Sequence, residues 1–229
     1  MVIFNEGYSA TAGDALVRRD LAAEAIRLGR MLVELMPDEP EAAGLLALML
    51  LHDARRDSRT DAAGELVLLE DQDRARWDRV AIEEGQAILD RALRAGAPGT
   101  YQIQAAIAAL HDAAPDAAST DWPQIAALYG RLAERTPSPV VELNRAVAVA
   151  MSEGPAAGLA LLDRLADQPA LAAYPYFHAA RADLLRRLGR AAASAESYRA
   201  ALATTGNDVE RAFLARRLAE VEPGLSRGS

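Results

Sequence analysis

Alanine and leucine supply most of the apolar residues of this chain, and prolines and glycines interrupt them at short intervals. Of the 229 residues, 51% are hydrophobic but only 5% are aromatic, so Ala and Leu must build the core. Both are strong helix formers, whereas Val and Ile, which favour strands, are too sparse for a sheet protein. The sequence therefore predicts an all-α protein, long enough to bury about 70% of its unfolded surface.

Capping residues and helix breakers predict about ten helices. Asp121 before Trp122-Pro123, and Ser138 before Pro139, place proline in the first turn of a helix, where it is favoured. The expected helices lie at about residues 15–36, 40–54, 74–95, 100–114, 122–135, 139–152, 155–166, 172–188, 191–204 and 208–220. Between the second and third, residues 55–65 read as a polar loop and residues 66–69 as an extended segment.

Two of these helices have distinctive apolar patterns. The first carries one apolar stripe, formed by Leu21, Ala25, Leu28, Leu32 and Leu35. The second has almost no polar face and is therefore expected to be central.

The short loops favour stacked antiparallel helical hairpins in a superhelix of the tetratricopeptide kind. Tyr129 followed by Pro137, and Tyr198 followed by Gly206, keep the aromatic-to-breaker spacing of that repeat. The two tyrosines are 69 residues apart, about twice the 34-residue period.

Residues 53–78, here called the charged strap, concentrate the polar chemistry of the chain. Arginine forks pair bidentately with carboxylates, so the preferred interpretation is an internal clamp that holds residues 55–69 onto the helices. The alternative is a recognition surface for a protein or ligand. The strap and the preceding helix end give these candidate binding residues: His52, Asp53, Arg55, Arg56, Glu70, Asp71, Asp73, Arg74 and Trp77.

The segment before the first helix is the second candidate surface. Asn5, Glu6 and Tyr8 lie in residues 1–14, which we interpret as a lead-in from preceding domains. Residues 15–114 are expected to form an N-terminal helical part that contains the strap, and residues 115–222 the tetratricopeptide-like hairpins. The tail, residues 223–229, is expected to be disordered.

The sequence lacks the motifs of the common enzyme classes. There is no phosphate-binding glycine loop, no nucleophile elbow and no zinc-protease motif, so neither catalytic residues nor a cofactor are predicted. The three histidines are on different predicted helices, and the start of a calcium loop at Asp71 fails at its sixth and twelfth positions, so no metal site is predicted. A net charge of −8 disfavours direct DNA binding, and no apolar run reaches membrane-spanning length. We expect a cytoplasmic protein.

Several strings of residues resemble one family. They are residues 3–8 (IFNEGY), 50–56 (LLHDARR), 69–74 (LEDQDR), 77–78 (WD), 101–109 (YQIQAAIAA) and 138–148 (SPVVELNRAVA). Together they resemble the C-terminal tetratricopeptide-like extension of a subgroup of extracytoplasmic-function (ECF) bacterial sigma factors. The resemblance extends over nearly the whole chain, from Ile3 to Glu220.

That resemblance implies a regulatory role in transcription initiation. The expected partners are the sigma-factor DNA-binding domains of the same polypeptide and the RNA polymerase core, and DNA would be contacted only through those missing N-terminal domains. It assigns no catalytic residue. The alternative hypothesis is a small-molecule sensor domain, with a pocket beside Trp77, that switches sigma-factor activity.

Overall fold

The fold is a curved stack of helices. The structure, a computed structural model, describes residues 15–222 and the side chains from Leu21 onward. In that part of the chain the elements are α1 (Ala15–Leu35), α2 (Pro40–Asp53), η1 (Arg56–Ser58), η2 (Arg74–Arg76), α3 (Arg79–Leu93), α4 (Thr100–Ala113), α5 (Trp122–Arg135), α6 (Pro139–Glu153), α7 (Pro155–Leu165), α8 (Pro169–Ala172), α9 (Pro175–Arg187), α10 (Ala191–Thr204) and α11 (Asp208–Val221). The described residues contain no strand, only an isolated bridge between Thr60 and Leu66. The all-α prediction is confirmed.

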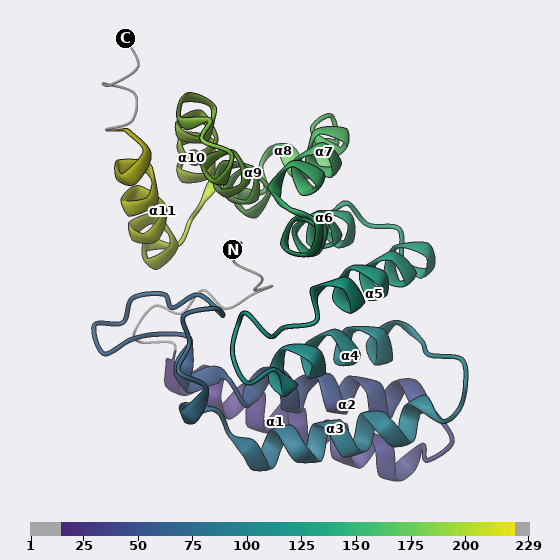
Figure 1. Cartoon of the computed structure of the whole chain (residues 1–229). Coiled ribbons are helices and arrows are strands. Elements are labelled where there is room, and N and C mark those ends of the chain that lie inside the picture. Colours follow the sequence, from purple (N-terminus) through teal and green to yellow (C-terminus); the bar gives the residue numbers. More distant parts are fainter. Residues whose placement is uncertain (1–14, 223–229) are drawn as a thin grey trace.

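Consecutive helices pack as hairpins, and the stack turns back on itself. Helices α1–α4 form one end, α5 and α6 lead away from it, and α7–α11 return toward the strap (Figure 1). Helix α2 is central as predicted, because it packs against α1, α3 and α4 and buries Leu46, Leu50 and Leu51. An ion pair between Glu65 of the strap and Arg216 of α11 joins the two ends of the curve. The strap therefore lies across the opening of the superhelix.

Two predicted helices differ from the structure, each for a local reason. Helix α3 begins at Arg79 rather than near residue 74, because Trp77 is extended and the Asp78 carboxylate caps the new helix by accepting from the Ala81 amide. The helix expected at residues 172–188 is preceded by a separate short helix, α8, and α9 begins only at Pro175. Proline disfavours helical geometry for the residue before it, so Tyr174 is extended and separates the two.

The apolar stripe of α1 faces outward. The residues that α1 buries against α2 lie on another face and include Ile26 and Gly29, with Val33 half-buried. Gly29 allows this close approach, because a Cβ there would lie 2.6 Å from Cε of Met49. Leu21, Leu28 and Leu35 remain 64%, 50% and 77% exposed. The predicted stripe therefore lies on one face of α1, but no described residue packs over it.

A glycine pair offers a direct test of the helix packing. A Cβ at Gly158 of α7 would lie 2.4 Å from the Ala150 Cβ and 2.6 Å from the Ala146 carbonyl oxygen of α6. Gly158→Ala is expected to cost about 1–3 kcal/mol of unfolding free energy through overpacking. Gly130→Ala in α5 is the matched control, since its nearest neighbour would be 3.9 Å away. That change should raise stability by about 0.5–1 kcal/mol, and equal effects of the two in urea unfolding would contradict the packing.

Candidate functional site

The charged strap folds back onto the helices through its arginines. Arg74 donates to the carbonyl oxygens of His111 and Ala114, at 2.7 and 2.8 Å, and so binds the C-terminal end of α4. Its guanidinium lies 4.5 Å from the centre of the Trp77 ring, a cation–π distance. Arg76 donates to the Asp57 carbonyl within the strap. The guanidinium groups of these two arginines thus contact backbone oxygens and, for Arg74, the face of an indole ring.

Arg55 and Asp112 form a buried ion pair beneath the strap. Nε of Arg55 lies 3.3 Å from Oδ1 of Asp112, and both side chains are shielded from solvent. The N–H is not aimed at the oxygen, so the pair is held by charge without hydrogen-bond geometry. A buried carboxylate needs such a counter-charge, because desolvation of an isolated ion costs several kcal/mol. Arg55 therefore joins α2 to α4 and cannot also present its charge at the surface.

The strap carboxylates cap local turns. Asp73 accepts from the Ala75 amide and starts η2, and Asp53 pairs with Arg56 one turn away. Glu70 is half-buried, and Asp71 is exposed beside a shallow groove between the strap and α11. The strap is held against the helices, as the sequence favoured, but mainly by arginine bonds to backbone oxygens and by the pair with Asp112 of α4 rather than by arginine–carboxylate pairs within the strap.

The candidate residues consequently separate into three groups. Arg55, Arg74 and Trp77 are buried or engaged inside the clamp, and His52 faces an interior cavity. Asp71 and Asp73 are exposed, and Asp53, Arg56 and Glu70 are half-buried. Asn5, Glu6 and Tyr8 fall outside the described residues, so a shared surface with the strap stays a prediction.

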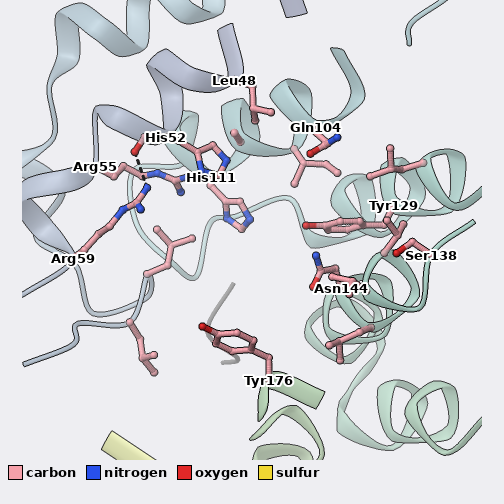
Figure 2. Close-up of a pocket in the computed structure, with 18 of the residues that line it drawn as sticks. Leu48, His52, Arg55, Arg59, Gln104, His111, Tyr129, Ser138, Asn144 and Tyr176 are labelled. Carbon is pink, nitrogen blue, oxygen red and sulfur yellow. Dashed lines mark hydrogen bonds between the residues drawn. The ribbon is translucent and has the colours of Figure 1, made fainter. Parts of the chain in front are cut away.

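A cavity of about 330 Å³ lies inside the curve of the superhelix. Its walls come from α2, the strap, α4, the α5–α6 corner and the start of α9. Figure 2 shows its labelled polar groups: His52, Arg55, Arg59 and His111 are on one side, with Tyr129, Ser138 and Asn144 across from them. Arg59 donates to the His52 carbonyl oxygen at 2.7 Å, which fixes the start of the strap against α2. The cavity thus lies between the two halves of the chain.

Burial perturbs the titratable groups beside this cavity. Burial, together with the charges of Arg55 and Arg59, lowers the pKa of His52 to about 3. Burial, with Arg55 and Arg74, likewise lowers the pKa of His111 to about 3. Burial raises the pKa of Asp112 to about 6, although the surrounding arginines act in the opposite direction. At neutral pH both imidazoles are therefore uncharged and can each donate and accept one hydrogen bond.

Sequence reasoning missed most of the cavity. Arg59 was only part of a polar loop, and Tyr129 was noted only for the spacing of the helical repeat. His111 was one of three histidines on separate predicted helices, and Tyr176 carried no local signal. The resemblance strings did include Gln104 and Asn144, which line the cavity, but gave no reason to place them together. These residues are up to 124 positions apart, from His52 to Tyr176, and meet only because the superhelix curves.

The described residues show neither a cluster of metal ligands nor a membrane-spanning helix. Within residues 15–222, no three His, Asp or Glu side chains converge as metal ligands would. None of the helices described there is long and apolar enough to cross a lipid bilayer.

Comparison with known proteins gives two matches. Residues 1–93 match a family described as "Family of unknown function (DUF6596)", a region that includes α1–α3 and the strap. The chain is also similar to an uncharacterized protein of Rhizobium meliloti (strain 1021), at 49% identity over 217 residues. That alignment takes in 95% of this chain and 51% of the relative. The chain thus spans about half the length of the curated relative that it matches.

Proposed function

We propose that this chain is the regulatory domain of an ECF-type sigma factor, acting in the cytoplasm through contacts with the sigma domains or the RNA polymerase core. DNA would be contacted by domains outside this chain, in keeping with the net charge of −8. The family resemblance motivates this proposal, and the chain's match to about half of a longer protein is compatible with a domain that regulates a neighbour. The outward face of α1 is the structural observation that carries it.

The apolar stripe of α1 has the pattern of a helix-docking seam. Its residues, Leu21, Ala25, Leu28, Leu32 and Leu35, recur at alternating intervals of four and three, which keeps them on one side of a helix facing a partner helix. All of them are exposed in the described structure. A row of exposed leucines of this length is a mark of a protein–protein contact. The occupant we propose is a helix of the sigma domains.

The strap is a weaker candidate for this contact. Two of its arginines, Arg55 and Arg74, are engaged internally. Reversing their charges would break the clamp and would not report on a partner surface. The seam of α1 is the better place to interrupt an interaction without unfolding the chain.

Leu28→Glu combined with Leu32→Glu is expected to weaken partner retention at least tenfold, about 1.4 kcal/mol. Two leucines that become buried on docking contribute about 1.5–3 kcal/mol each, so their loss should be easily visible. The 229-residue chain is immobilised and offered purified bacterial RNA polymerase core. In a parallel experiment it is offered the part of the Rhizobium meliloti relative that it does not match. Retained protein is quantified against concentration.

Val80→Glu provides the matched control for this experiment. Val80 is on α3 and 76% exposed, so the same apolar-to-charged change is made outside the seam. It should leave retention unchanged, and circular dichroism should show equal helix content for all variants. If the unaltered chain retains neither partner, or if Val80→Glu is as harmful as the seam variant, the proposed contact is wrong.

A small-molecule sensor is the second candidate function, and the interior cavity favours it. Its volume, about 330 Å³, lies at the lower end of the range for ligand sites, and it is lined by both halves of the superhelix. A ligand there would change how the halves hold together and could thereby change the shape offered to a partner. The two candidates are compatible, since one concerns the outer face and the other the interior.

A further inference from the structure

The interior cavity presents uncharged polar groups that the described chain does not use. Among the described residues, the ring nitrogens of His52 and His111 and the side-chain amides of Gln104 and Asn144 make no hydrogen bond. Burial, with nearby arginine charges, lowers the pKa of both imidazoles to about 3, so both rings are neutral at pH 7. A neutral imidazole donates one hydrogen bond and accepts another, and a primary amide does both. The cavity walls therefore offer donors and acceptors to a ligand.

The charged side chains of the wall are already engaged. Nε of Arg55 lies 3.3 Å from Oδ1 of the buried Asp112, and Arg59 donates to the His52 carbonyl oxygen at 2.7 Å. None of the described residues that line the cavity is Asp or Glu. A charged ligand would lose its hydration there without gaining a free counter-charge, which is strongly unfavourable. An uncharged ligand avoids that cost.

Apolar side chains separate the polar groups. His52 and His111 lie on one side of the cavity and Asn144 lies across from them, with Gln104 of α4 at the upper edge of this view (Figure 2). The lining between these groups is apolar and comes from α2, the strap, α4 and α6; it includes Leu48, Leu68, Ile107, Val140 and Leu143. Ligand sites commonly combine an apolar lining with a few polar groups that fix orientation. Such walls suit an apolar body with a polar group at each end.

We propose that this cavity binds an uncharged small molecule with an apolar body, held at one end by His52 and His111 and at the other by Asn144, with Gln104 at its edge. The volume of about 330 Å³ suits a compound of low molecular weight rather than a peptide. Because each imidazole can present either a donor or an acceptor, the site accommodates a hydroxyl, a carbonyl or an amide. The inference names the ligand class for the sensor candidate and rests on that candidate.

A series of naphthalene compounds separates charge from shape. The uncharged probe is 6-hydroxy-2-naphthamide, which has a polar group at each end. At about pH 7.5, 6-hydroxy-2-naphthoate is an anion and 6-amidino-2-naphthol a cation of similar shape, and 2-naphthamide lacks the hydroxyl group. Isothermal titration calorimetry of the 229-residue chain measures each affinity. We expect saturable binding of 6-hydroxy-2-naphthamide, at least about tenfold weaker binding of the two charged probes, and binding of 2-naphthamide that is weaker by about three- to tenfold.

Two cavity variants then locate the bound probe. Gln104→Leu and Asn144→Leu each remove an amide from the wall while keeping a similar side-chain volume. Each should weaken binding of 6-hydroxy-2-naphthamide by about three- to tenfold, the usual effect of losing one hydrogen bond. Gln124→Leu is the matched control, since Gln124 is exposed on α5 and does not line the cavity. Its affinity should equal that of the unaltered chain, and circular dichroism should show equal helix content in all three variants.

Several results would overturn the proposal. One is the absence of saturable binding of 6-hydroxy-2-naphthamide at millimolar concentration. Another is equal or tighter binding of the naphthoate or the amidine, which would show that the site is charged. Undiminished affinity in both Gln104→Leu and Asn144→Leu would place the probe elsewhere, and equal affinity for 2-naphthamide would contradict a polar group at each end. These titrations contain no partner protein, so their failure is distinct from a failure of partner retention through α1.

Discussion

Arg55→Met is expected to lower the free energy of unfolding by about 3–5 kcal/mol, the usual cost of leaving a buried charge without its partner. Asp112 would keep its place on α4, fully buried, without the nearest of its counter-charges. The strap would also lose the contact of Arg55 with the Trp77 ring, whose centre is 5.9 Å from the guanidinium carbon. Urea unfolding followed by far-UV circular dichroism measures the loss.

The double variant Arg55→Met with Asp112→Leu isolates the electrostatic part. Replacing both partners of a buried ion pair by apolar residues of similar volume is often neutral or stabilising, because neither group then has to be desolvated. We therefore expect the double variant to recover most of the stability that Arg55→Met loses. Recovery would show that the pair fixes how α2 meets α4 more than it adds net stability.

Arg56→Met is the matched control for this cycle. Arg56 pairs with Asp53 in a half-exposed setting, and ion pairs near the surface contribute at most about 1 kcal/mol. Arg55 and Arg56 are adjacent in sequence but differ in burial, so the comparison separates environment from residue type. Equal losses for the two arginines would mean that the buried pair does not hold the clamp.

The sequence predicted the helix boundaries well because their causes are local. The Asp121 cap and the prolines at 123 and 139 act within one turn, and α5 and α6 begin where those signals place them. Helix α3 is the informative exception, since Asp73 and Asp78 are both good caps and each starts a helical turn. The hydrogen bond from the Asp78 amide to the Ala54 carbonyl, a contact across the strap, accompanies the start of the longer helix.

The partners within the site could not be predicted, because they depend on packing between distant segments. Sequence alone indicated that the strap arginines would find carboxylates nearby. In the structure Arg55 instead pairs with Asp112, and Arg74 with the backbone at the end of α4. The sequence also could not predict which face of α1 packs against α2, since either face of that helix has enough apolar residues to pack. Gly29 decides it by permitting the close approach of Met49.

Acidification from about pH 7 to pH 5 is expected to destabilise the fold by about 2–3 kcal/mol. The pKa values of His52 and His111, both about 3 in the folded chain, lie well below the ordinary value of 6.5. In this range the unfolded chain therefore binds protons that the folded chain excludes, so stability falls as pH decreases. The two histidines alone would lower the free energy of unfolding by about 4 kcal/mol between pH 7 and pH 5, and Asp112 offsets part of this loss.

Asp112 opposes this trend. Its pKa is raised by burial to about 6 from an ordinary value of 3.8, so the folded chain takes up this proton more readily than the unfolded chain. That difference raises the free energy of unfolding by about 1 kcal/mol as the pH falls from 7 to 5. The histidines therefore dominate, and the net slope keeps their sign.

Histidine variants test this assignment through the slope rather than through absolute stability. His52→Gln and His111→Gln should each remove about half of the histidine contribution to the loss between pH 7 and pH 5, measured as urea unfolding free energies at each pH. His178→Gln is the control, because that ring lies on α9 and contacts the Ala172 carbonyl, away from the cavity arginines. It should leave the slope unchanged. A slope that persists in the variant lacking both His52 and His111 would show that other groups titrate, and the cavity would then not be the acid-sensitive part of the fold.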